Sequence, residues 1–144
     1  MSWHHLLFEH PITAELIWSF VLPKAVENGT CSLEKIVRRG ILKYLVYYHE
    51  KGYGEWHSYI MDWAAENGHI EIVKWLHENR TEGCTKHAMN WAAYNGHVEI
   101  VKWLHENRNE AYIESALLIS KRYNHTKIVE YLQQYIKRPP QFVQ

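Results

Sequence analysis

The sequence predicts an all-α protein, a solenoid built from short helical repeats. Three observations carry this prediction: a block of sequence occurs twice at an offset of 28 residues, each copy reads as two short helices separated by a glycine, and neither helix alone covers its apolar side. Residues 61–80 and 89–108 are identical at 17 of 20 positions. Neighbouring units must therefore stack to form one continuous core.

The same offset leads to a degenerate copy on either side of the central two. Residues 116–132 keep the apolar pattern, with Asn124 where the central units have glycine and His125 at the following position. Residues 33–50 keep the glycine as Gly40. We expect three to four units, at about 33–57, 58–85, 86–113 and 114–136.

Each unit is predicted to contain two helices joined by a tight turn. In the second unit, the first helix runs from about Ser58 to Asn67 and the second from about Ile70 to Asn79. Gly68 ends the first helix, because glycine adopts the left-handed conformation at a helix end without steric cost. Small alanines in the first helix and an apolar stripe on the second allow the two to pack closely.

These residues resemble the ankyrin repeat. The matching strings are WAAENGHIEIVKWL at 63–76 and WAAYNGHVEIVKWL at 91–104. The unit is about five residues shorter than the usual ankyrin unit, and residues 60–62 and 88–90 stand where the family has its Thr-Pro-Leu-His opening. The resemblance implies an ankyrin-like solenoid with shortened or absent β-hairpins and a plain loop at 78–85.

This short variety is similar to the ankyrin arrays encoded in large numbers by giant DNA viruses of amoebae and by some protists. That similarity implies a viral or host-directed ankyrin protein.

The segments outside the repeats are predicted to be a helical cap and a tail. Residues 1–30 do not match the repeat, and their apolar residues indicate one or two amphipathic helices that cover the end of the stack. An alternative is an F-box-like helix, with residues 5–23 contacting a ubiquitin-ligase scaffold. Residues 137–144 contain two prolines, which end the helical pattern.

Composition excludes several classes of function. Lys+Arg and Asp+Glu number 16 each, so the chain lacks the basic excess of proteins that bind nucleic-acid phosphates or anionic membranes. The apolar stretch 12–22 is too short to span a bilayer. With only Cys31 and Cys84, and no signal-peptide pattern, we expect reduced thiols in an intracellular, cytoplasmic protein.

The eleven histidines raise the question of a metal site, but six of them recur at the repeat offset. Units in such a stack lie ~10 Å apart, too far for neighbours to share a zinc ion at about 2.1 Å. We therefore expect the turn histidines to hydrogen-bond neighbouring backbone, with no metal and no cofactor. The two sets are His69, His97 and His125 in the turns, and His49, His77 and His105 on the second helices.

No catalytic constellation is predicted. Cys84 and His87 have a ligand-like spacing, but no second pair completes a metal site and no third group would orient a catalytic base. The periodic aromatics are interpreted as packing between units, with binding or self-association through exposed Trp edges as the alternative. They are Trp63 and Trp91 on the first helices, and Tyr47, Trp75, Trp103 and Tyr131 on the second helices.

The resemblance implies that partners contact the exposed ends of the first helices and the loops before them. The one radical difference between the central units, Glu66 against Tyr94, falls on this surface. We predict a non-catalytic module that binds a protein there, with a ubiquitin-ligase adaptor and a structural or self-associating repeat protein as alternatives. The predicted contact residues are Arg38, Arg39, Trp56, His57, Glu66, Asn67, Lys86, His87, Tyr94, Asn95, Arg122 and Tyr123.

Overall fold

The computed structural model describes residues 32–109 and 112–136. The predicted cap or F-box-like helix at 1–30 and the tail at 137–144 lie outside the described residues. Within them the chain forms eight helices and no strands, which confirms the predicted all-α fold without β-hairpins. The helices are α2 (Leu33–Arg38), α3 (Leu42–Lys51), α4 (Tyr59–Glu66), α5 (Ile70–Asn79), α6 (Lys86–Tyr94), α7 (Val98–Asn107), α8 (Ile113–Arg122) and α9 (Thr126–Ile136).

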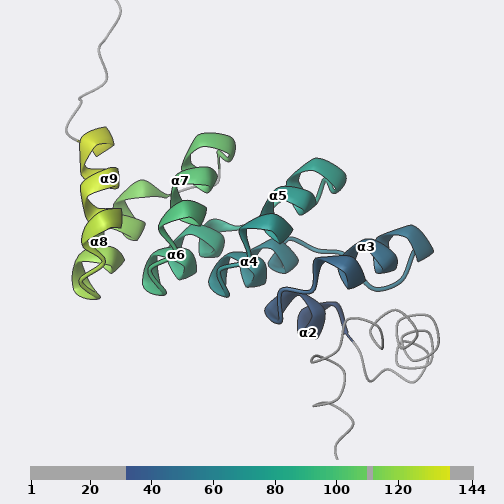
Figure 1. Ribbon diagram of the computed structural model, residues 1–144. Coiled ribbons are helices and arrows are strands. Elements are labelled where there is room, and N and C mark those ends of the chain that lie inside the picture. Colours follow the sequence, from purple (N-terminus) through teal and green to yellow (C-terminus); the bar gives the residue numbers. More distant parts are fainter. Residues whose placement is uncertain (1–31, 110–111, 137–144) are drawn as a thin grey trace, which may run out of the picture.

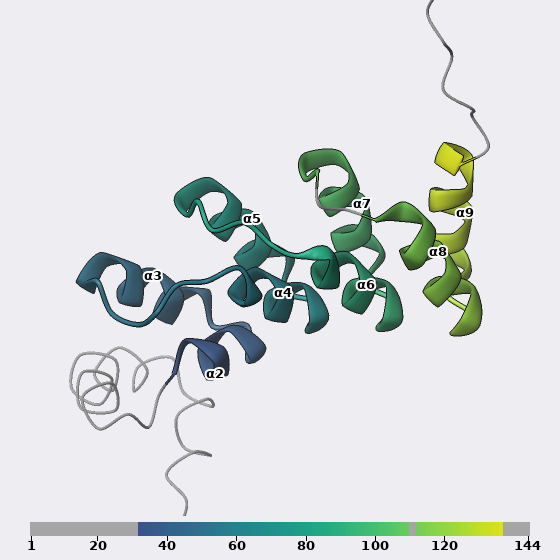
Figure 2. The ribbon, with the colours of Figure 1, turned by 180° about the vertical axis from the view of Figure 1, so that it is seen from behind.

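The helices are arranged as four pairs in a row (Figure 1). The first helices of the pairs, α2, α4, α6 and α8, lie side by side and pack closely against one another. The second helices, α3, α5, α7 and α9, form another row in which neighbours touch much less, and the reverse view shows the same arrangement (Figure 2). The stack is therefore held together mainly along the row of first helices.

Small side chains explain this close packing. Ala64 and Ala65 of α4, and their counterparts Ala92 and Ala93 of α6, are completely buried. An alanine in the first helix lets the backbones of neighbouring pairs approach, while the second helices contribute the large apolar side chains of the core. The buried members in the two central pairs are Ile72, Val73 and Leu76 of α5, and Ile100, Val101 and Leu104 of α7.

The turn between the two helices in each of the first three pairs is fixed by a histidine of the next pair. Gly68 follows α4 with φ +81°, and a Cβ added there would lie 2.8 Å from Cε1 of the His97 ring. The His97 ring fills this space and its Nε2 donates to the backbone oxygen of Glu66 at 3.0 Å. Glycine is thus required both for the backbone conformation and for the room that the ring occupies.

The same contact recurs along the stack. His69 Nε2 donates to the oxygen of Arg38 at 3.0 Å, and His125 Nε2 donates to the oxygen of Tyr94 at 2.8 Å. A carbonyl oxygen only accepts, so each ring nitrogen must carry the proton. The prediction that the turn histidines bond neighbouring backbone is confirmed.

A buried carboxylate joins the second pair to the third. Asp62 is completely buried, and its oxygens accept from the backbone N–H of Thr85 at 2.8 Å and from the Thr85 hydroxyl at 2.6 Å. Desolvation raises the pKa of Asp62, although these two bonds and the nearby His87 act in the opposite direction.

Thr85 also sets the start of α6. Its hydroxyl oxygen accepts from the backbone N–H of His87 at 3.1 Å, which makes it the N-cap of the helix. Residues 88–90, which the sequence places at the opening of the unit, lie inside α6, because the cap stands before them.

Candidate protein-interaction surface

One side of the first helices faces solvent along the whole stack. On α4 this side carries Tyr59, Trp63 and Glu66, whose i, i+4, i+7 spacing places them on one stripe of a helix. At the repeat offset, the corresponding stripe of α6 carries His87, Trp91 and Tyr94. We call this side the first-helix face; its members are Arg38, His57, Tyr59, Trp63, Glu66, His87, Trp91, Tyr94, Arg122 and Tyr123.

Charged groups order the face where the first pair meets the second. Arg38 Nη1 lies 2.8 Å from Glu66 Oε2, and Arg38 Nε lies 3.0 Å from Glu34 Oε1. The Arg38 guanidinium also lies over the ring of Trp63, 5.5 Å from its centroid. Such exposed pairs each contribute at most about 1 kcal/mol to folding, so their main effect is to fix where these side chains lie.

Aromatic and imidazole rings form the middle of the face. The His57 ring meets the edge of the Trp63 ring at 5.4 Å between centroids and that of Tyr59 at 5.8 Å. On the next pair, His87 stacks on Trp91 at 5.1 Å. Trp63 packs against the buried core, as the sequence interpretation expects, and both Trp63 and Trp91 keep part of their surface exposed on this face.

Two tyrosines extend the ring surface to the last pair. Tyr94 of α6 and Tyr123, just after α8, lie with ring centroids 4.4 Å apart in an edge-to-face arrangement. They remain 48% and 43% exposed. Two large rings that are mutually ordered yet half open to solvent offer a rigid apolar contact with little entropy left to lose.

Two predicted contact residues have structural roles. The Asn67 amide donates to the oxygen of Trp63 at 2.8 Å, and the Asn95 amide donates to the oxygens of Trp91 at 3.2 Å and Glu66 at 3.0 Å. The Trp63 and Trp91 carbonyls also accept from the backbone N–H of Asn67 and Asn95, so the side-chain bonds reinforce the C-terminal ends of α4 and α6. The two amide groups are thus committed to the scaffold.

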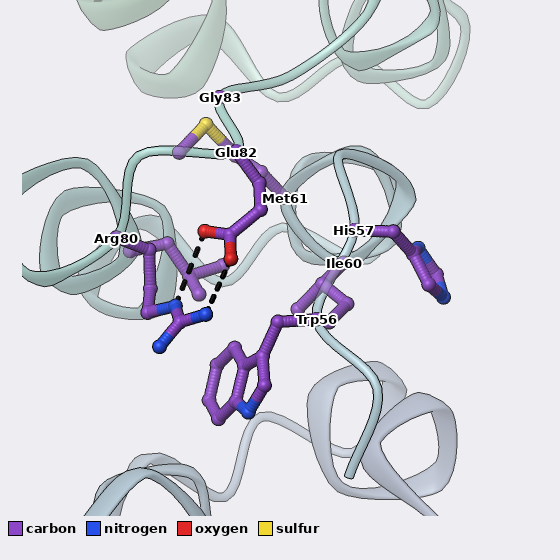
Figure 3. A pocket seen from close by; sticks show the side chains of 8 residues that line it. Trp56, His57, Ile60, Met61, Arg80, Glu82 and Gly83 are labelled. Atoms are coloured by element: carbon purple, nitrogen blue, oxygen red, sulfur yellow. Dashed lines mark hydrogen bonds and ion pairs between the residues drawn. The ribbon is translucent and has the colours of Figure 1, made fainter.

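The predicted loop residues do not all lie together. Figure 3 shows Trp56 beneath Arg80, whose guanidinium carbon lies 4.4 Å from the ring centroid, while His57 points away to the first-helix face. Arg80 is in turn paired with Glu82, its Nε 3.1 Å from Oε2. The cavity between these groups is about 10 Å³, room for roughly one water molecule. Trp56 therefore belongs to the side of the second helices.

The remaining predicted residues lie at helix ends. Arg39 follows α2 and Lys86 begins α6, and both are exposed. Arg122 ends α8 and is exposed, at the position equivalent to Glu66 and Tyr94.

Sequence reasoning missed Tyr59 as a member of the face. Tyr59 is 49% exposed and contacts His57. The i, i+4, i+7 pattern of Tyr59, Trp63 and Glu66 was the signal that could have identified it.

The periodic aromatics of the second helices pack against the core, as expected from the sequence. Across residues 32–109 and 112–136, no three His, Cys, Asp or Glu side chains are grouped as a metal site would require. None of the helices described there has the length and apolar character needed to cross a membrane.

The stacked helix pairs and the histidine contacts between them define a helical-repeat protein. Residues 61–105 match the family model described as ankyrin repeats (many copies), so this part of the chain consists of ankyrin repeats. A comparison with curated proteins finds no match. Ankyrin repeats are generally protein–protein interaction modules and typically non-catalytic.

Proposed function

We propose that this chain is a non-catalytic binding module that holds a protein partner on the first-helix face. The observation that carries the proposal is the row of ordered, partly exposed rings along α4, α6 and α8. Most members of the row are fixed by a neighbour: His57 by Trp63, His87 by Trp91, and Tyr94 by Tyr123. Tyr, Trp and Arg are the side chains that most often anchor protein interfaces.

The comparison of the central units supports the same surface. The buried alanines and the turn glycine and histidine are the same in both units, while the face changes from Glu66 to Tyr94. Glu66 is held by Arg38, and Tyr94 is held by Tyr123, so each pair presents a different chemistry. A constant scaffold with a varied surface is what selective recognition requires.

The shape and charge of the face favour a protein over other ligands. The hollow beside His57 and Trp63 has a volume of about 410 Å³ but is wide open to solvent, whereas a small-molecule site buries most of its ligand's surface. Acidic side chains such as Glu34 and Glu66 neutralise Arg38, so the rings have no basic groove around them for nucleic acid.

The proposal includes a cytoplasmic, host-directed role, in keeping with the resemblance of the repeats to viral arrays. The alternative adaptor role would place a ubiquitin-ligase contact in residues 5–23, outside the described residues.

The test compares two double variants of the full chain. Y94A/R122A removes two exposed members of the first-helix face, and E71A/E99A changes the second helices, where both glutamates are more than 70% exposed. Affinity capture with quantitative mass spectrometry should show partners retained by the wild type and E71A/E99A but reduced at least tenfold by Y94A/R122A, a loss of about 1.4 kcal/mol. Equal retention by both, with unchanged circular dichroism, would refute the face.

A further inference from the structure

Each of the first two joints between second helices contains a histidine that accepts a hydrogen bond from an arginine of the following pair. Arg80, the C-cap of α5, places Nη1 3.4 Å from Nδ1 of His49 on α3. Arg108, the C-cap of α7, places Nη1 3.2 Å from Nδ1 of His77 on α5. Both arginines lie 31 residues after their histidine, so the contact repeats with the units.

The arginine partner fixes the protonation state of these two rings. A guanidinium has five donors and no acceptor, so Nδ1 of His49 and of His77 must carry a lone pair. Each ring is then neutral, with its proton on Nε2. If the ring takes up a second proton, Nδ1 becomes a donor, the hydrogen bond is lost, and two cations face each other at about the same distance.

The other periodic histidines donate a hydrogen bond through the ring nitrogen concerned, whereas His49 and His77 accept one. The turn histidines donate through Nε2 to carbonyl oxygens, a bond that a protonated ring makes equally well. His105 Nδ1 lies 2.9 Å from the Tyr131 hydroxyl, which itself donates to Glu106 Oε1 at 3.3 Å. Because that hydroxyl has only one proton, His105 must donate to it and is also compatible with a positive charge.

The contacts described for the two accepting rings are with aromatic rings and with arginine. His49 is half-buried between Trp56 and Trp75, with centroids 5.9 and 5.2 Å away, and its partner Arg80 is also paired with Glu82. His77 is half-buried and meets Trp103 at 5.0 Å and the Arg108 guanidinium.

The helix that carries His77 also carries a cation, Lys74, on the preceding turn. Lys74 is paired with Glu71 on the same helix, 3.9 Å apart.

We propose that the His49–Arg80 and His77–Arg108 contacts make the stack acid-sensitive on its outer side. Proton uptake by these two histidines breaks the joints that connect α3 to α5 and α5 to α7. The first helices pack closely and remain together, whereas neighbouring second helices touch little and separate. Acid thus opens the row of second helices and changes the curvature of the stack.

The first test measures unfolding of the full chain in urea between pH 7.5 and 5. In H49N/H77N, asparagine Oδ1 stands at the place of Nδ1 and accepts from arginine at every pH. As the pH falls from 7.5 to 5, the equilibrium constant for unfolding of the wild type should rise relative to that of H49N/H77N. The rise is at most ~10-fold per pH unit for each accepting histidine. The matched control H105N, which removes a donor, should keep the wild-type dependence.

Parallel curves for the wild type and H49N/H77N would overturn the proposal, as would an equal flattening by H105N. If H49N/H77N does not fold, the wild type alone decides. Nitrogen NMR of its imidazoles at pH 7.5 should show Nδ1 of His49 and His77 unprotonated and Nδ1 of His105 protonated. A proton on Nδ1 of either accepting ring would contradict the inferred hydrogen bonds.

Discussion

Replacing Gly68 with alanine tests the contact that joins neighbouring pairs. Gly68 has φ +81°, and the left-handed conformation costs a residue with a Cβ roughly 1–2 kcal/mol. The new methyl group would also lie 2.8 Å from Cε1 and 3.0 Å from Nδ1 of His97, and such overpacking costs about 1–3 kcal/mol. We expect G68A to lower the free energy of unfolding by about 3 kcal/mol, measured in urea by far-UV circular dichroism.

Gly52 provides a matched control for the backbone term. It ends α3 with φ +69°, and a Cβ there would meet nothing within 4 Å. G52A should therefore cost only the roughly 1–2 kcal/mol of the left-handed conformation. The excess cost of G68A over G52A measures the contact with the ring.

The double variant G68A/H97A separates the two effects. H97A removes one hydrogen bond, at about 1 kcal/mol, and the Glu66 oxygen keeps its bond from Asn95 at 3.0 Å. Without the ring, the alanine at 68 should cost no more than G52A, so the double variant should be about 1–3 kcal/mol more stable than the sum of the single effects predicts. Additive effects, or equal costs for G68A and G52A, would refute the reasoning.

Three further predictions concern the buried carboxylate and the face. T85A should lower the free energy of unfolding, measured in urea, by about 2–3 kcal/mol, because it removes both the cap of α6 and a bond to buried Asp62. T85S keeps the hydroxyl and should stay near wild type. Equal losses for the two variants would contradict this. Since burial raises the pKa of Asp62 above its ordinary value of 3.8, the stabilisation from its protonated form is complete below that pH and is lost as the pH rises through the raised pKa. The wild type should therefore gain stability relative to D62N in urea titrations from pH 7 to 4, and a constant difference would be inconsistent with the raised pKa. Y94A/Y123A should change the melting temperature by only a few degrees, because both rings are half-exposed; a loss of the cooperative transition would show that they belong to the core.

The repeat made most of the fold predictable from the sequence. The offset between residues 61–80 and 89–108 located the helices, and Gly68 marked the turn of the second pair. The periodic spacing of the turn histidines also indicated their structural role, because a residue that recurs with the unit occupies the same place in each. These features follow from local rules and from stacking, which the sequence expresses directly.

Other features depend on three-dimensional contacts that spacing does not reveal. Asp62 and Thr85 are 23 residues apart and differ in kind from Asn90 and Ile113, their counterparts in the next unit, so the repeat gave no sign of their bond. Trp56 does not recur at the repeat offset, so its position under Arg80 was not predictable.

The same limit applies to the face, where Tyr59 was overlooked. The helix predicted from about Ser58 already contained the stripe of Tyr59, Trp63 and Glu66, but the exposure of Tyr59 depends on how the neighbouring pairs pack.

The histidine contacts along the turns all point the same way along the stack: each ring reaches back to the pair before it. Each of the two central units supplies a histidine ring to the turn of the unit before it and a turn glycine that makes room for the ring of the unit after it. The first described pair has Ile41 where the later ones have histidine, and the last has Asn124, at φ 60°, where the earlier ones have glycine. Asparagine meets the backbone requirement there, and no ring of a following pair contacts it within the described residues. A copy of either central unit, inserted between the two, would regenerate both contacts at both of its borders, so the array can lengthen by duplication of 28 residues without any compensating change.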